Sequence, residues 1–239
     1  SQKMNKLLLI LSLCFVFATE LEIDGDLKIQ GDLIFQDETS INTAPIIFPI
    51  YNGMVEFVSD NYWIVPENIT SVYIEMVGAG GDGGSGGCCN YAAGGGGGGG
   101  GGYLIGIFSV TPGDSLEIQV GNGDTEVSIQ NQILALAPKG LDGGNVGMNG
   151  GSSPAGSGGS GSCGQIITGS GITRCGHGGD TGTGPSQGNS TPGGEGGASY
   201  RGIKGAFGTG GKGGNGNGNQ WTSGPPGENG TTGYIYIQW

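Results

Sequence analysis

The sequence predicts an all-β protein with long glycine-rich insertions. Short segments of alternating apolar residues recur along the chain, and 59 of its 239 residues are glycine. A period of two is that of a half-buried strand, and no segment after residue 18 has helical periodicity. Glycine and proline together reach the range of disordered chains, so a flexible linker protein is the alternative. The gathering of apolar residues into discrete strands disfavours that alternative.

Residues 4–18 have the features of a secretory signal peptide. Lys6 precedes an apolar core of about a dozen residues, and Val16 and Ala18 fit the two small positions of a cleavage site. The segment is too short for a membrane span. We therefore expect residues 1–18 to be a signal peptide, with residues 1–3 extraneous to a start at Met4. The mature protein is then secreted, without stable membrane insertion; a retained anchor or buried helix is the alternative.

Residues 19–45 form a predicted short β stalk. Gly-Asp-Leu recurs at 25–27 and 31–33 between alternating apolar residues, as in short strands broken by turns. So short a segment cannot bury its apolar face alone. It needs other copies of itself or the main domain, and a strand folded onto its own domain is the alternative. Residues 35–44 also resemble the connector before the distal domains of phage tail fibres and bacterial surface fibres, which implies self-association as a homotrimer or fibre.

The main domain is predicted at 46–239, since the two prolines of Pro45–Pro49 mark a boundary. A four-residue turn at 111–114 predicts a hairpin between its flanking strands, and Gln130-Asn131 predicts a second hairpin. The last strand is expected to pair inside the sheet, after an insertion at about 138–231 with almost no strand signal. The predicted strands are 53–59, 62–65, 69–77, 103–110, 115–120, 126–129, 132–137 and 232–239.

The run Gly94–Gly102 consists of nine glycines between two of the predicted strands. Ordering glycine is entropically unfavourable, because glycine loses more backbone freedom on folding than any other residue. Its position between strands nevertheless indicates an ordered segment rather than a tail.

Three motifs carry a resemblance that covers residues 55–239. They are Val-Tyr-Ile-Glu-Met-Val-Gly-Ala-Gly-Gly at 72–81, the glycine run with the following Tyr-Leu-Ile-Gly-Ile-Phe-Ser-Val-Thr-Pro-Gly-Asp, and the terminal Gly-Tyr-Ile-Tyr-Ile-Gln-Trp. This pattern resembles the glycine-rich domain of bacterial surface proteins and phage tail-fibre proteins. It is also similar to the glycine-rich extracellular module of the anaplastic lymphoma kinase and leukocyte tyrosine kinase receptors.

The resemblance implies a jelly-roll-like β-sandwich whose glycine insertions fold as polyglycine-II helices. Such helices have three residues per turn and no internal hydrogen bonds, so their backbone groups must bond to neighbouring helices. The stretches expected to form them are 78–87, 94–102, 140–151, 156–164, 176–184, 193–197 and 208–218.

Four cysteines remain after the signal peptide, and an even number in an exported chain predicts two disulfides. Cys88 and Cys89 are adjacent, so we expect each to pair with Cys163 or Cys175, in an order that the sequence leaves open. A zinc site that includes His177 is the alternative, although the spacing matches no common zinc finger.

Few residues have a pattern that indicates catalysis or cofactor binding. Gly208–Gly214 lacks the hydroxyl that follows lysine in a phosphate-binding loop, and His177 has no nearby paired acid. A net charge of −12 without a basic patch disfavours nucleic acid. We expect no enzyme activity, cofactor or metal. Four aspartates could instead be calcium ligands, but solvated turns are the preferred interpretation; they are Asp82, Asp124, Asp142 and Asp180.

The aromatic residues Tyr200, Phe207 and Trp221 are the predicted binding residues, as loop-tip side chains for a glycan or protein surface. Covering the ends of the glycine bundle is their alternative role. Asn68, Asn189 and Asn229 match the acceptor pattern for N-glycosylation, which applies only if the protein is eukaryotic. The sequence thus predicts a secreted structural or adhesive module of an extracellular fibre or surface assembly. Glycan or receptor recognition is the first alternative and ice binding the second.

Overall fold

The computed structural model describes residues 33–34, 40–41, 53–89, 91–146, 154–187, 189–200, 207–218 and 224–239. The chain divides into two compact units, Ser1–Phe48 and Pro49–Trp239. In the first unit, strand β1 (Leu33–Ile34) pairs antiparallel with β2 (Ser40–Ile41). The predicted signal peptide and most of the predicted stalk lie outside the described residues.

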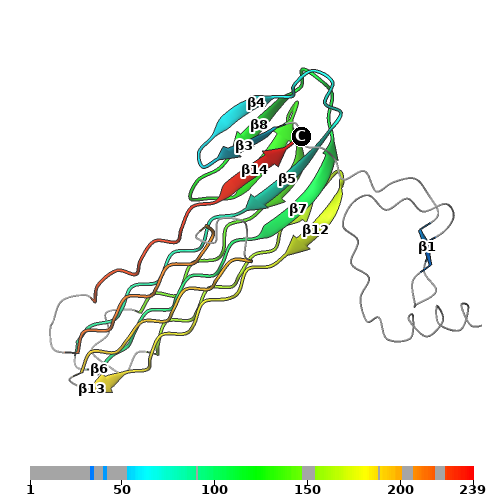
Figure 1. Cartoon of the computed structure of the whole chain (residues 1–239). Helices are drawn as coiled ribbons and strands as arrows, with labels where there is room; N and C mark the ends of the chain where they lie inside the picture. The colour runs from blue at the N-terminus through cyan, green and yellow to red at the C-terminus, as the bar shows by residue number, and fades with distance from the viewer. Residues whose placement is uncertain are drawn as a thin grey trace, which may run out of the picture. The chain divides into compact units, whose positions relative to one another are not determined.

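The second unit contains two antiparallel five-stranded sheets (Figure 1). The first sheet, with strand order β12-β7-β5-β14-β3, comprises Ser170–Arg174, Tyr103–Ser109, Ser71–Val77, Tyr234–Gln238 and Met54–Phe57. The second sheet, with order β11-β10-β9-β8-β4, comprises Gln165–Ile166, Gln132–Ala137, Thr125–Ile129, Ser115–Gln119 and Asn61–Ile64. A short pair, β6 (Tyr91–Ala92) with β13 (Ser186–Gln187), lies apart from them. The described residues contain no helix, so the predicted all-β class is confirmed.

Alternating apolar residues of the two sheets form the core between them. In β5, Val72, Ile74 and Met76 are buried and belong to one cluster with residues of the facing sheet, such as Leu116 and Ile118. The C-terminal strand β14 lies between β5 and β3, which confirms that the last strand pairs inside a sheet. Trp239 at its end contacts Trp63 of β4, with ring centroids 5.0 Å apart.

One of the two predicted hairpins is wrong. β7 pairs with β5 and β12, whereas β8 pairs with β4 and β9, so the turn at 111–114 joins strands of different sheets. The reason is burial: both strands have an apolar face, and the two faces meet across the core rather than side by side. The second hairpin, β9–β10, is confirmed, and its turn residues Gln130 and Asn131 both have positive φ, as a type I′ turn requires.

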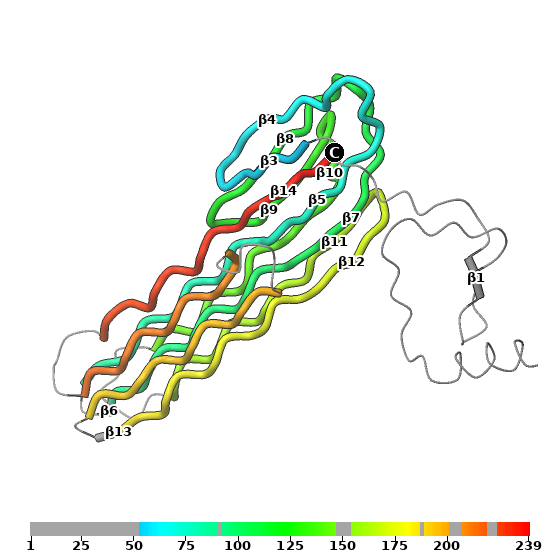
Figure 2. The backbone as a smooth tube through the Cα atoms, viewed as in Figure 1, coloured from blue at the N-terminus to red at the C-terminus, as the bar shows by residue number. Residues whose placement is uncertain are grey.

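Eight extended segments, here called rods, run from one end of the two sheets within the described residues (Figures 1 and 2). The strand ends at Val77, Tyr103, Arg174 and Tyr234 lie together in register, so the chain enters and leaves the rods at one edge. Rods 1 to 8 are 78–87, 94–102, 138–146, 156–164, 176–184, 191–198, 208–217 and 225–231. The eighth was not predicted, and part of the predicted 140–151 stretch lies outside the described residues.

Rod 2, the nine-glycine run, lies at the centre of the bundle. Its backbone N–H groups donate in three directions that repeat every third residue, at 2.8–3.0 Å. Gly94, Gly97 and Gly100 donate to rod 5; Gly95, Gly98 and Gly101 to rod 7; Gly96, Gly99 and Gly102 to rod 3. Its carbonyls accept from rods 1, 4 and 6. Six rods therefore surround rod 2, and the repeat of three is the one that polyproline-II geometry has.

The six outer rods also bond to each other in a closed ring. Around rod 2 the order is 1, 3, 4, 5, 6 and 7, and hydrogen bonds such as that from Gly211 N to Gly81 O connect rod 7 back to rod 1. Rod 8 lies outside the ring and bonds to rods 1 and 7 through Gly80, Glu228 and Thr231. The backbone of the rods thus finds in its neighbours the partners that buried N–H and C=O groups require.

Glycine is required in rod 2 by close approach. A Cβ atom added at any of its nine residues would lie less than 3.0 Å from a backbone atom of rod 1, 4 or 6. Backbone atoms cannot turn aside as a flexible side chain does, and protein interiors have few voids to absorb the atom. The run is therefore the interior of a bundle in which main chain takes the place of side chains.

Candidate functional site

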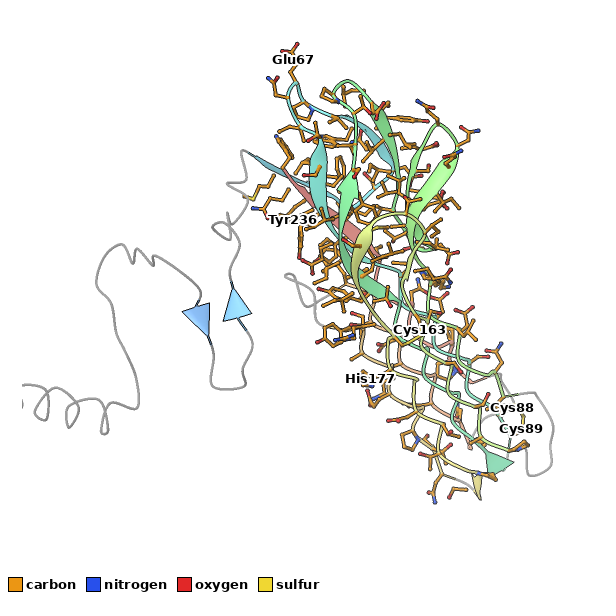
Figure 3. The ribbon with its side chains drawn as sticks, turned by 90° about the vertical axis from the view of Figure 1, so that its right-hand side faces the viewer. Glu67, Cys88, Cys89, Cys163, His177 and Tyr236 are labelled. Atoms are coloured by element: carbon orange, nitrogen blue, oxygen red, sulfur yellow. A yellow bond between two sulfur atoms is a disulfide. The ribbon has the colours of Figure 1, made fainter. Side chains whose placement is uncertain are left out.

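The predicted aromatic residues do not gather at a loop tip. The ring of Tyr200 packs on Tyr103 at 5.1 Å, and Phe207 packs on Tyr234 at 4.8 Å, on the face of the first sheet opposite the core. Tyr236 lies on the same face (Figure 3). Trp221 lies outside the described residues. A binding role for the three stays a prediction, and the contacts of Tyr200 and Phe207 are those of side chains that cover the sheet.

A buried carboxylate lies under this aromatic cover. Glu75 is 2% exposed, and its Oε1 accepts a hydrogen bond of 2.9 Å from the Tyr234 hydroxyl. Burial, and then the charge of Glu75, raise the pKa of Tyr103 well above its usual value. The phenol of Tyr103 is thus protonated at neutral pH and can donate a hydrogen bond.

The four cysteines form two disulfides, but with a different pairing from the one expected. Cys88 bonds to Cys89, and Cys163 bonds to Cys175. The expected cross-pairing is wrong because the two pairs lie at opposite ends of the rods: Cys163 is close to the sheets, and Cys88 and Cys89 are near the far end (Figure 3). Cys89 has φ of 67°, which lets the chain turn at the end of rod 1.

These pairings also remove the zinc alternative. The Cys175 sulfur is bonded to Cys163, so it is not the thiolate that zinc would bind beside His177. His177 is exposed on rod 5, where its backbone N–H donates to Ala198 O. In the part of the chain that the structure describes, no three histidine, cysteine or acidic side chains form a group that could hold a metal.

Two of the candidate calcium ligands are paired with a lysine instead. The Lys139 ammonium lies 3.2 Å from Asp82 and 3.0 Å from Asp142, joining rods 1 and 3. Burial acts to lower the pKa of Lys139, but the hydrogen bonds and charges of Asp142 and Asp82 outweigh it and raise that pKa. The backbone N–H of Asp82 and the Lys139 ammonium lower the pKa of Asp142 despite partial burial. The two aspartates, whose side chains are 47% and 60% exposed, thus form a partly solvated charge cluster with Lys139 between rods 1 and 3.

The remaining candidates have ordinary roles. Asp124 accepts a hydrogen bond from the backbone N–H of Lys139, and Asp180 is exposed on rod 5. Lys212 forms an ion pair of 2.6 Å with Glu195, which raises the pKa of Lys212. The three asparagines of the glycosylation pattern, Asn68, Asn189 and Asn229, are all exposed.

A surface hollow that the sequence did not reveal lies at β4 and β8. Its volume is about 360 Å³, and its lining consists of Asp60, Asn61, Tyr62, Glu117, Ile118 and Gln119. Strand pairing sets Tyr62 opposite Glu117, and the Tyr62 hydroxyl lies 3.4 Å from the Glu117 carboxylate. Tyr62 differs from a core aromatic residue in being 67% exposed. The exposure of one strand residue is hard to predict from sequence, so the hollow was not predicted.

The surroundings of the hollow are acidic. Asp60 and Glu117 contribute carboxylates to it, and Asp60 Oδ1 also accepts a 2.7 Å hydrogen bond from Val120 N, which fixes one wall. Burial, and then the charges of Glu117 and Asp124, raise the pKa of the neighbouring Glu126. The hollow therefore combines an exposed aromatic ring, hydrogen-bond acceptors and two amide side chains, Asn61 and Gln119.

No protein-family model matches this chain, and no curated protein sequence matches it either. Among the described residues, no helix has both the length and the apolar composition that a membrane crossing requires.

Proposed function

We propose that this chain is a secreted structural and adhesive module, a subunit or tip of an extracellular fibre or surface assembly. The observation that carries the proposal is the closed ring of six rods around rod 2. Its interior consists of main chain, with no side chains to bind or transform a substrate. At about 3.1 Å per residue, rod 2 spans about 28 Å, the length of a stiff spacer rather than of a catalytic loop.

The disulfides support an extracellular location. Both pairs are formed, and disulfides persist in oxidising compartments such as the exterior of the cell. Disulfide-bonded cysteines are thus compatible with an extracellular protein. That the chain is exported through residues 1–18 belongs to the proposal.

The short β1–β2 pair supports self-association through residues 19–45. Each strand has two residues, and an isolated two-stranded pair is marginally stable in water. Strands from further copies would extend the pair by hydrogen bonding to its free edges. We therefore place the assembly contact in this segment, with a homotrimer or fibre as the product.

The mass in solution tests this proposal. Light scattering on residues 19–239 should give a trimer or larger species, and residues 46–239 should give a monomer. The shorter chain retains the whole second unit, so its circular dichroism should show intact sheets. A monomer for both chains would contradict assembly through residues 19–45.

A further inference from the structure

The hollow at β4 and β8 has the composition of a binding site rather than of a packing defect. Tyr62 and Ile64 alternate with the partly buried Trp63, so register turns the Tyr62 ring away from the core. A ring that is 67% exposed gains little from packing inside the protein. It is nevertheless held by the strand and by the contact of its hydroxyl with Glu117. A rigid aromatic ring offers a large contact area at a low entropic cost.

The polar groups around the ring select the kind of ligand. Carboxylates of Asp60 and Glu117 accept hydrogen bonds from hydroxyl groups, and the amides of Asn61 and Gln119 both donate and accept. The carboxylates repel phosphate, sulfate and uronic acids. Ile118 is 1% exposed and points into the core, so it offers the hollow no apolar side chain. A ligand must therefore have one apolar face for Tyr62 and hydroxyls at its edge, but no negative charge.

The size of the hollow limits the ligand further. About 360 Å³ lies at the lower end of the roughly 300–1,000 Å³ that small-molecule sites occupy. The hollow is open to the surface, so the ligand can be the end of a longer polymer. A sugar ring meets each requirement: its C–H groups form an apolar face and its hydroxyls lie around the rim.

We infer that the hollow binds one or two neutral sugar residues at the end of a glycan, with Tyr62 stacked on the sugar ring and Glu117 accepting from its hydroxyls. This inference rests on the proposed adhesive function and supplies its contact surface. The glycan site inferred here lies on β4 and β8, and thus not at the sequence-predicted residues Tyr200, Phe207 and Trp221.

The test is a titration of the ¹⁵N-labelled chain 19–239 followed by NMR. The probes are the methyl glycosides of mannose, glucose, galactose and N-acetylglucosamine, with glucuronic acid as the charged counterpart. At least one neutral glycoside should shift the amide signals of 60–64 and 115–119, with Kd near about 1 mM, as expected for so small a contact. Glucuronic acid should cause no shift there.

Variants test whether the sugar binds in the hollow rather than elsewhere on β4. Tyr62→Ala should weaken binding at least about tenfold, as loss of a central aromatic does, whereas Tyr62→Phe should keep most of it. Glu117→Gln should weaken binding severalfold. Ile64→Ala is the matched control, because Ile64 is 58% exposed on the same strand but outside the hollow; its affinity should stay within twofold.

Three outcomes would overturn the inference: no shift with any glycoside up to about 50 mM, far above the expected Kd; shifts confined to other strands; or binding unchanged in Tyr62→Ala. If no glycoside binds, a trimer or larger species in light scattering would still support the proposed assembly. If the chain binds a sugar but is a monomer, only the proposed assembly is refuted. The two proposals thus fail separately.

Discussion

Gly98 illustrates why a single hydrogen is the only side chain that the centre of the bundle admits. Its N–H donates to Gly211, its carbonyl accepts from Gly197, and its Cβ position points at the Gly81 carbonyl. Three neighbouring rods therefore meet at one residue. The conformational freedom that glycine loses on folding is offset here by two backbone hydrogen bonds, one to rod 7 and one from rod 6.

Gly98→Ala should therefore lower the free energy of unfolding by at least about 3 kcal/mol, because a rod must move to admit the methyl group. Gly184→Ala is the matched control: no atom lies within 4 Å of the added Cβ, so its stability should change by less than about 1 kcal/mol. Urea denaturation measures both. Equal stability of the two variants would refute the close packing of rod 2.

Single residues also show where sequence reasoning reaches its limit. The nine glycines of rod 2 were expected to be ordered, because a run between strands has its ends fixed. Tyr62 was not among the predicted binding residues, because alternation places Tyr62 and Trp63 on opposite faces of a strand without indicating which face is buried. Which of two alternating side chains faces outward depends on how β4 pairs with β8. The residues of β4 do not by themselves specify that pairing.

At the scale of elements, the two disulfides should differ in their effect on stability. Cys163 and Cys175 are 12 residues apart and close a loop of the unfolded chain, whereas Cys88 and Cys89 are adjacent and close almost none.

Cys163→Ser with Cys175→Ser should therefore cost about 2–3 kcal/mol, and Cys88→Ser with Cys89→Ser less than about 1 kcal/mol. Guanidinium unfolding of the two double variants measures the difference. A larger loss for the adjacent pair would mean that the turn after rod 1, rather than loop closure, sets the stability.

The elements with their own local signal were predictable, and the others were not. β5, β9, β10 and β14 follow from alternation, and the β9–β10 turn follows from residues that tolerate positive φ. β12 was missed because all five of its residues are exposed and no alternation marks it. Rod 8 was missed because prolines and polar residues interrupt it, although glycine recurs every third residue at 227 and 230 and just before it at 224.

The second unit is one connected structure of sheets and rods, because rods 1, 2, 3 and 4 directly continue strands, and rods 5 and 8 are joined to β12 and β14 by one and two residues. Rod 2 cannot open to water unless the ring around it separates. Its amides should therefore exchange only when the unit unfolds globally.

Hydrogen exchange measured by mass spectrometry or NMR should thus give the nine amides of Gly94–Gly102 protection as high as that of β5. Those of β12, an exposed edge strand, should exchange faster by at least about a hundredfold, since local fraying suffices there. Comparable exchange in rod 2 and β12 would show that the bundle opens independently of the sheets.

The repeat of three in the rods gives this part of the chain something like a reading frame. A residue inserted into an outer rod turns every later residue by about 120°, so a side chain that faced solvent comes to face rod 2. Insertions of three residues in each rod would instead lengthen the bundle by one turn, about 9 Å. Evolution can therefore change the length of such a bundle only in whole triplets, as it changes a coding sequence by codons, and a lone insertion acts on the protein as a frameshift does on a gene.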